Sequence, residues 1–304
     1  MLAVIHRNTP PRGAGALALA GPAVIIRQLQ WLHDLGGERV AIELGPDAQG
    51  EQLRRRVTAH KVLARGVIFV PSATPLSARA LGQEAGFPPE ARWLALPESV
   101  VGNADLTRLF REPLATGTRV GRLVPPRTGG PFPPAEVHLT GPGTGPLTEE
   151  SLPGWGTHVE TPGMALRLAC EALLGRLSLL LHAAEVRPGV WVARGGRIDD
   201  GAELSPPVLL GAGARICSRA RVGPGALIGA RALIEPRACV EQALVEDNTI
   251  VGEGLVVREH LATPRGLLPL NAGSGLPPLR EPLLAARRAP LLPERLSHLL
   301  RIPP

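Results

Sequence analysis

A six-residue period in the C-terminal half is the feature that most constrains how this chain can fold. Branched aliphatic residues recur at every sixth position, eight times in succession. These residues are Ile198, Leu204, Leu210, Ile216, Val222, Ile228, Ile234 and Val240. The residue two places before each is Gly or Ala in seven of the eight cases, and after Val240 the phase slips by one residue. Chance does not hold a phase for so long, so the pattern indicates one small structural unit repeated many times.

A period of six predicts a parallel β-helix. Each six-residue unit supplies one short strand and one turn, with the branched aliphatic side chain inside and the small residue at the corner. Three units make a triangular coil, and stacked coils bury a continuous aliphatic column. We therefore expect the eight aliphatic residues to form the core of this region. A β-sandwich would instead alternate with a period of two.

The N-terminal half shows a different pattern, in which strands alternate with helices. Leu2–Ile5 and Val67–Val70 are short apolar runs typical of buried strands, and Val40, Ile42 and Leu44 alternate. Apolar residues at helical spacing follow Pro22. This alternation predicts an α/β domain with a parallel sheet. A helix is expected from Met164 to Leu181. The expected domains are an α/β domain (1–165), a connecting helix and linker (166–189), the β-helix (190–262) and a Pro/Leu/Arg-rich tail (263–304).

Composition argues against several classes of partner. Lys61 is the only lysine among 33 basic residues, and aromatic residues are 3% of the chain with no tyrosine. A basic stripe with aromatic stacking platforms is therefore missing, and we expect no nucleic-acid partner. The apolar runs are too short and too interrupted to span a bilayer. The three cysteines show no paired spacing, which favours small buried side chains in a reducing, cytoplasmic compartment.

Three segments carry a resemblance to a known family. Leu19–Gly36 is similar to the stretch in sugar-nucleotide pyrophosphorylases where a loop enters the first long helix. Trp155–Pro162 resembles the Trp-x-Asp-x-Gly-Thr-Pro motif of that family, and Glu246–Gly254 resembles the end of the β-helix in bacterial members that serve surface-polysaccharide loci. The resemblance covers most of 1–262. It implies a Rossmann-like nucleotidyltransferase-type domain followed by a left-handed β-helix.

The resemblance also implies a reaction, attack of a sugar 1-phosphate on the α-phosphorus of a nucleoside triphosphate. Such chemistry depends on positioning and on cancelling charge. The family supplies a Gly-rich loop after the first strand, a lysine shortly beyond it, and two aspartates that hold Mg²⁺. Open α/β sheets bind ligands at the carboxyl ends of their strands. We expect a cleft there at the ends of Leu2–Ile5 and Val67–Val70, lined by His6–Gly15, Pro71–Thr74 and Trp155–Pro162.

Each of the four catalytic parts departs from the family pattern. The loop His6–Gly15 lacks the signature, and its two prolines each remove a backbone N–H that could bind phosphate. No lysine precedes the first helix, and no acid follows Val67–Val70 before Glu84. When the motif is aligned on its final Thr-Pro, His158 stands in place of the second aspartate, and Glu160 replaces the glycine. Four losses together indicate release from catalysis.

The sequence therefore predicts a catalytically degenerate pyrophosphorylase-like protein linked to nucleotide-sugar and polysaccharide metabolism. It would act as a ligand-sensing or partner-binding subunit. We expect it to form a homo-oligomer or a complex with another protein. We expect no catalytic residue, no metal site and no cofactor. Arg7 and Arg12 would make the anion contacts to a sugar nucleotide or sugar phosphate. The full set of candidate ligand-binding residues is Arg7, Arg12, Gly13, Gly15, His158 and Glu160.

Two alternative hypotheses remain, and in both of them the chain is an enzyme. An active sugar-1-phosphate nucleotidyltransferase with a drifted signature would use Arg7, Arg12 and Glu160, and would require Mg²⁺. A hexapeptide acyltransferase would share the β-helix, but such enzymes typically place a histidine base in or beside the coils. No histidine occurs between His182 and His260, so this reading is the weaker one.

Overall fold

The computed structural model divides the chain into two compact units. The described residues are 1–7, 23–111, 114, 116–127, 132–142, 145–271 and 279–286. The first unit comprises Met1–His182 with Leu270–Leu276, and the second comprises Ala183–Pro269 with Pro277–Pro304. Strands outnumber helices and many strand pairs are parallel, so the chain is a mixed α/β protein. None of the helices in the described part of the chain has the length and apolar character that crossing a membrane requires.

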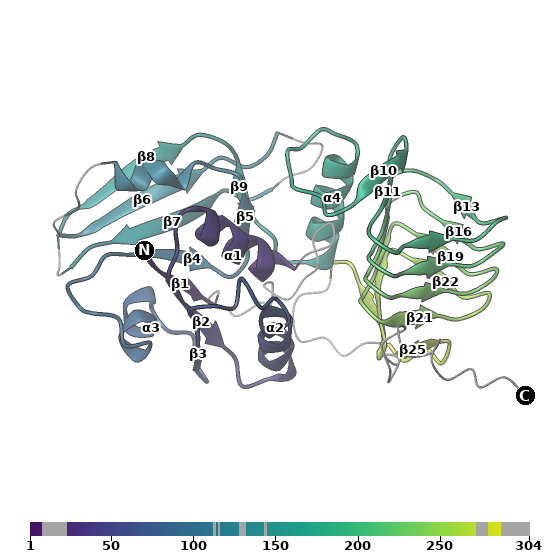
Figure 1. The fold of residues 1–304 in the computed structure, drawn as a ribbon, viewed down its shortest axis with the longest axis horizontal. Coiled ribbons are helices and arrows are strands. Elements are labelled where there is room, and N and C mark those ends of the chain that lie inside the picture. The colour runs from purple at the N-terminus through teal and green to yellow at the C-terminus, as the bar shows by residue number, and fades with distance from the viewer. Residues whose placement is uncertain are drawn as a thin grey trace, which may run out of the picture. The chain divides into compact units, whose positions relative to one another are not determined.

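The first unit is built on a seven-stranded sheet that is parallel in one half, as the sequence predicts for this region (Figure 1). The strand order is β3-β2-β1-β4-β7-β6-β8. The parallel strands are β1 (Leu2–His6), β2 (Arg39–Leu44), β3 (Val67–Pro71) and β4 (Trp93–Pro97). The remaining strands are β7 (Ala135–Thr140), β6 (Thr118–Leu123) and β8 (Leu147–Leu152), of which β7 is antiparallel to both of its neighbours. A small ribbon pairs β5 (Val100–Gly102) with β9 (Gly156–His158).

Helices cover both faces of the parallel strands, which explains why successive residues of these strands are mostly apolar. Ile5 and Ile42 pack on one face in the same cluster as Ile25 of α1 (Val24–Asp34) and Leu53 of α2 (Ala48–Thr58). Val4 and Trp93 pack on the other face with Leu81 of α3 (Ala78–Glu84). A short 3-10 helix, η2 (Leu106–Phe110), follows β5.

The helix expected over Met164–Leu181 is α4, which is shorter and belongs to the first unit. It spans Pro162–Leu173. It begins at Thr161, whose side chain accepts a hydrogen bond from the Met164 N–H at 3.2 Å. It ends before Gly175, whose φ of +71° is a common way to close a helix. The unit boundary lies after His182, so residues 166–182 of the predicted connecting segment 166–189 belong to the first unit.

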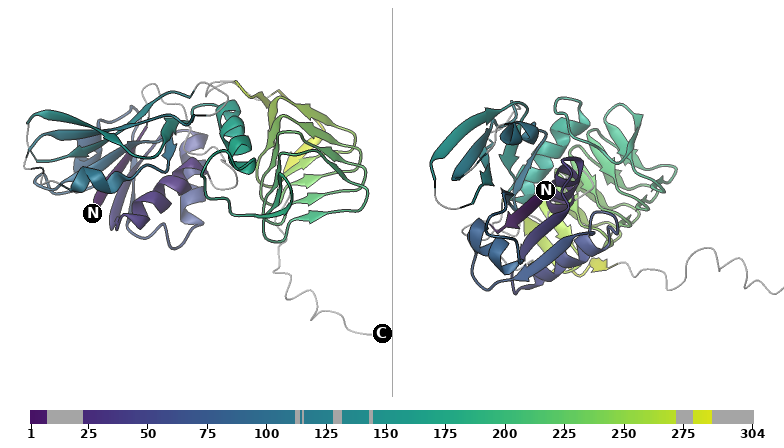
Figure 2. Two further views of the ribbon diagram at one scale, coloured as in Figure 1. Left: turned by 90° about the horizontal axis from the view of Figure 1, so that it is seen from above. Right: turned by 60° about the vertical axis from the view of Figure 1, so that its left-hand side comes forward.

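The second unit consists of three sheets that the chain visits in rotation (Figure 2). The first sheet contains β10 (Ala184–Arg187), β11 (Val190–Val192), β14 (Val208–Leu210), β17 (Ala226–Ile228), β20 (Ala243–Val245), β23 (His260–Thr263) and β24 (Gly266–Pro269). The second contains β12 (Arg197–Ile198), β15 (Arg215–Ile216), β18 (Leu233–Ile234), β21 (Thr249–Val251) and β25 (Leu284–Ala286). The third contains β13 (Glu203–Leu204), β16 (Arg221–Val222), β19 (Cys239–Glu241) and β22 (Val256–Arg258).

The strand register reproduces the six-residue period. Arg197 pairs with Arg215, 18 residues further along the chain, so one circuit takes three six-residue units. From Ala226 the spacing is 17 residues, because Ala226 pairs with Ala243. A single residue, Gln242, connects β19 to β20, and its φ of +46° turns the chain at that corner. This shortened corner is the one-residue slip that the sequence shows after Val240.

Most of the periodic aliphatic residues lie in one buried column. Leu210, Ile216, Val222, Ile228, Ile234 and Val240 are all buried within a single cluster. Leu204 is partly buried against the same cluster. The expectation does not hold for Ile198, which is 37% exposed. Ile198 lies in β12, the first strand of its sheet, which has a neighbouring strand only on one side.

Candidate functional site

The topology of the first sheet places a candidate ligand-binding edge at β1 and β4. Strand order reverses at β1, because β2 lies on one side of it and β4 on the other. Ligands of open α/β sheets bind outside the carboxyl ends of the strands at such a reversal. The sequence-based expectation placed the cleft at the carboxyl ends of β1 and β3; β2 lies between these two strands, and β4 is the other neighbour of β1. The turn that leaves β4 therefore also lies at this edge, and the Pro71–Thr74 turn reaches the end of β1 through the Ser72 carbonyl, which accepts a hydrogen bond from Arg7.

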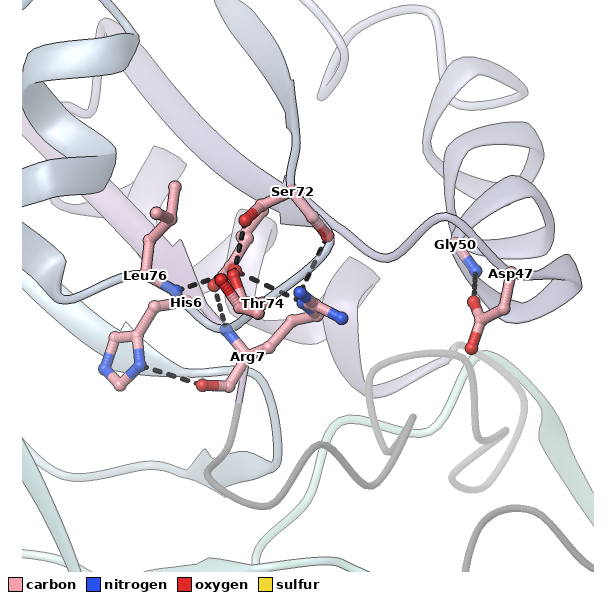
Figure 3. A network of polar contacts seen from close by, with 8 residues as sticks. His6, Arg7, Asp47, Gly50, Ser72, Thr74 and Leu76 are labelled. Carbon is pink, nitrogen blue, oxygen red and sulfur yellow. Dashed lines mark hydrogen bonds and ion pairs between the residues drawn. The ribbon is translucent and has the colours of Figure 1, made fainter.

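Arg7, expected to contact an anionic ligand, is instead part of a buried ion pair (Figure 3). Its Nε lies 3.2 Å from Glu43 Oε1, and its Nη2 donates to the carbonyl of Ser72 at 2.8 Å. Glu43 also accepts the backbone N–H groups of Arg7 and Leu76, both at 2.9 Å. The two charged side chains are 9% and 0% exposed. Arg7 therefore holds β1, β2 and the segment after β3 together.

Glu43 and its partners would have been hard to recognise from the sequence. Glu43 occupies the alternate position between Ile42 and Leu44 of β2, where an exposed acid is the ordinary expectation. Its burial depends on Arg7 and Leu76, which lie 36 and 33 residues away. A lone acid inside an otherwise apolar strand was the only available signal.

A buried glutamine positions the turn that follows β4. Gln28 of α1 is fully buried, and its Nε2 donates to the carbonyls of Pro97 at 2.7 Å and Val100 at 2.8 Å. These two carbonyls bracket Glu98 and Ser99. The Glu98 N–H in turn donates to the carbonyl of His6 at 2.8 Å, which ties the turn to the end of β1. The turn is thus fixed from two sides.

The structure brings this turn together with the segment Trp155–Pro162. His158 Nδ1 lies 2.7 Å from the Ser99 hydroxyl, and the Val159 N–H donates to the Ser99 carbonyl at 2.8 Å. The pairing of Val100 with His158 in the β5–β9 ribbon maintains the register. His158, selected from the sequence, therefore lies at the strand-order reversal, and Glu160 follows it two residues later. Sequence reasoning missed Glu98 and Ser99, because it did not identify β4.

Two nearby groups complete the description of this edge. Burial lowers the pKa of His6, and the charge of His138 lowers it further, although the Arg7 carbonyl and Glu43 act in the opposite direction. The imidazole of His6 therefore tends to be neutral. Glu98 is a nearly buried carboxylate at the carboxyl end of β4. Across the described ranges, no group of three or more His, Cys, Asp or Glu side chains is arranged to hold a metal ion.

Three of the predicted ligand-binding residues, Arg12, Gly13 and Gly15, lie outside the described residues. The chain matches no protein-family model, and no curated protein matches it. Among the described residues, Glu98, Ser99 and His158 and the ion pair of Arg7 with Glu43 make up the candidate site.

Proposed function

We propose that this chain is a sugar-nucleotide pyrophosphorylase-like protein that binds a sugar nucleotide or sugar phosphate without turning it over. It acts as a ligand-sensing or partner-binding subunit in cytoplasmic nucleotide-sugar and polysaccharide metabolism. In this proposal the first unit is a Rossmann-like nucleotidyltransferase-type domain. The second unit is a left-handed hexapeptide β-helix, which the 18-residue circuit and the buried aliphatic column support.

The hydrogen bond between His158 and Ser99 is the observation that carries the proposal. It lies at the strand-order reversal, where α/β sheets bind ligands. In the resembling family the position of His158 is an aspartate that holds Mg²⁺. Here an imidazole meets a neutral hydroxyl at 2.7 Å. Imidazole suits softer metals than Mg²⁺, so this pair favours recognition of a ligand over Mg²⁺-assisted transfer.

The ion pair between Arg7 and Glu43 supports the same conclusion. A phosphoryl-transfer site needs cations aimed at the charge that develops during the reaction. The Nε and Nη2 donors of Arg7 are directed at Glu43 and at the Ser72 carbonyl inside the protein. These two donors at the end of β1 are therefore engaged by partners inside the protein.

Thermal unfolding with a panel of ligands tests the proposal. The panel contains UDP-glucose, dTDP-glucose, GDP-mannose, the matching nucleoside triphosphates and sugar 1-phosphates, each with and without Mg²⁺. We expect at least one sugar nucleotide or sugar phosphate to raise the unfolding temperature by several degrees. At 100 times its Kd, a ligand contributes about 2.7 kcal/mol. The stabilisation should not require Mg²⁺, and no pyrophosphate should be released. Failure of every ligand to stabilise the protein would refute the proposal.

Glu98 favours one alternative, an active sugar-1-phosphate nucleotidyltransferase. It is an acid at the carboxyl end of the strand next to β1, and the sequence-based argument for lost catalysis did not count it. If Mg²⁺-dependent pyrophosphate release is measured with any pair of triphosphate and sugar 1-phosphate, Glu98→Gln should abolish it. That result would replace the non-catalytic proposal with this one.

A further inference from the structure

The segment of residues 174–182, here called the strap, leads from α4 into β10, the first strand of the second unit. Two side chains of the first unit fasten it. The indole N–H of Trp155 donates to the carbonyl of Ser178 at 3.2 Å, and Arg27 Nη1 donates to the carbonyl of Leu180 at 2.8 Å. Leu177 between α4 and these two points is buried, being 9% exposed. The strap is thus an ordered part of the first unit.

The same two elements hold the turn at the strand-order reversal. Arg27 is followed in α1 by Gln28, which binds the Pro97 and Val100 carbonyls on either side of Glu98 and Ser99. Trp155 precedes His158 by three residues, and His158 is hydrogen-bonded to Ser99. In α1, Arg27 therefore contacts the strap and the adjacent Gln28 contacts the turn. In the segment that contains β9, Trp155 contacts the strap and His158 contacts the turn.

The connection through Trp155 is stiff. The backbone N–H of Trp155 donates to Asn103 Oδ1 at 3.0 Å, and the Asn103 N–H donates back to the Trp155 carbonyl at 3.0 Å. From there the β5–β9 ribbon continues to the pairing of Val100 with His158. Trp155 itself is nearly buried, so its indole has little room to move independently of the ribbon. A shift at Ser99 must move this segment or break its hydrogen bonds.

The connection through Arg27 joins a half-buried guanidinium to the carbonyl of an exposed residue, Leu180. Burial lowers the pKa of Arg27 to about 10, which indicates a guanidinium partly removed from water. A hydrogen bond from a charged donor is stronger than one between neutral groups. Arg27 therefore links the Leu180 carbonyl to α1.

We propose that the strap senses whether the turn Glu98–Ser99 is occupied by a ligand and passes that state along the chain toward β10. This inference rests on the proposed function. A site that senses a ligand without turning it over needs another part of the protein to change when the ligand binds, and the strap is that part. Trp155 and Arg27 are positioning residues in this device, and neither needs to touch the ligand.

Hydrogen–deuterium exchange of the strap in the full-length protein tests the device without any ligand. Ser99→Ala removes the hydroxyl that meets His158, at a place remote in sequence from the strap. We expect strap amides to exchange about three- to tenfold faster in this variant, as the loss of one buried hydrogen bond allows. In the double variant Trp155→Phe with Arg27→Met, strap exchange is already fast, and adding Ser99→Ala should accelerate it little further.

A matched control removes a hydroxyl elsewhere in the same unit. The Ser77 side chain accepts the Ala80 N–H at 3.2 Å at the start of α3, so Ser77→Ala also deletes one hydrogen bond. It should leave the strap unchanged. If Ser99→Ala affects the strap no more than Ser77→Ala does, or if its effect simply adds to that of the double variant, the device is refuted.

A ligand arm separates failure of the device from failure of the proposed function. The ligand from the thermal panel that stabilises the protein most is added to wild type and to the double variant. We expect altered strap exchange in wild type alone, with thermal stabilisation kept in both. Stabilisation without any change in strap exchange overturns the device and leaves the proposed function intact. If no ligand stabilises the protein, the proposed function fails, and the sensing device, which depends on it, fails as well.

Discussion

At the residue scale, the ion pair of Arg7 with Glu43 changes the expected effect of replacing Arg7 on the stability of the fold. From the sequence alone, Arg7 is expected to contact an anionic ligand. In the structure both side chains are buried and their hydrogen bonds are internal. Removal of one member of such a pair leaves the other charged, buried and uncompensated.

We predict that Arg7→Ala lowers the free energy of unfolding by about 3–5 kcal/mol. The double replacement Arg7→Met with Glu43→Leu should recover part of this loss, because neither charge then remains alone. Chemical denaturation monitored by tryptophan fluorescence measures both. Arg55→Ala is the matched control, since Arg55 forms an exposed ion pair with Glu51 at 2.9 Å and should cost much less. Equal losses at Arg7 and Arg55 would show that the Arg7 pair is not buried.

At the element scale, the second unit shows what repetition makes predictable. The inward position of each strand recurs every six residues, so local sequence identifies Ile216, Ile228 and their equivalents without knowledge of the fold. The one-residue corner at Gln242 is visible as a slip of phase. Exposure at the end of the stack is not visible, because Ile198 has the same local pattern as Ile228 but lacks a strand on one side.

This difference between two isoleucines gives a direct test of the column. Ile228→Asp places an uncompensated carboxylate at a site that is 2% exposed, and we predict loss of folding of the second unit, a cost above about 4 kcal/mol. Ile198→Asp makes the same change in the same phase at a site that is 37% exposed, and should cost far less. Urea unfolding compares the two variants. Similar stabilities for the two variants would contradict the strand register.

In the first unit, elements were predictable but their neighbours were not. Apolar runs and helical spacing indicate β1, β3 and α1 because each depends on local pattern. The order of strands in the sheet depends on which surfaces pack together, and local sequence patterns do not determine this order. The sequence therefore did not reveal that β4 lies beside β1, and Gln28, Glu98 and Ser99 were missed. His158 was found because a motif resemblance, and not local periodicity, pointed to it.

At the scale of the whole molecule, the chain crosses between its two units more than once. It leaves the first unit after His182 and returns to it at Leu270. The Leu270 carbonyl accepts the N–H of Gly163 at 2.7 Å, which satisfies one of the free amides at the start of α4. The first unit is thus completed by residues that follow the second unit in sequence. The strap directly precedes β10, so a change in the strap would occur where the chain enters the repeated strands.

The central claim is that the edge between β1 and β4 binds a sugar nucleotide or sugar phosphate and leaves it intact. A crystal structure with the most stabilising ligand of the thermal panel, grown with Mg²⁺ present, tests this claim most directly. We predict density for an uncleaved ligand beside Glu98, Ser99 and His158. Density for reaction products there, or for the ligand bound elsewhere with this edge unaltered, would contradict it.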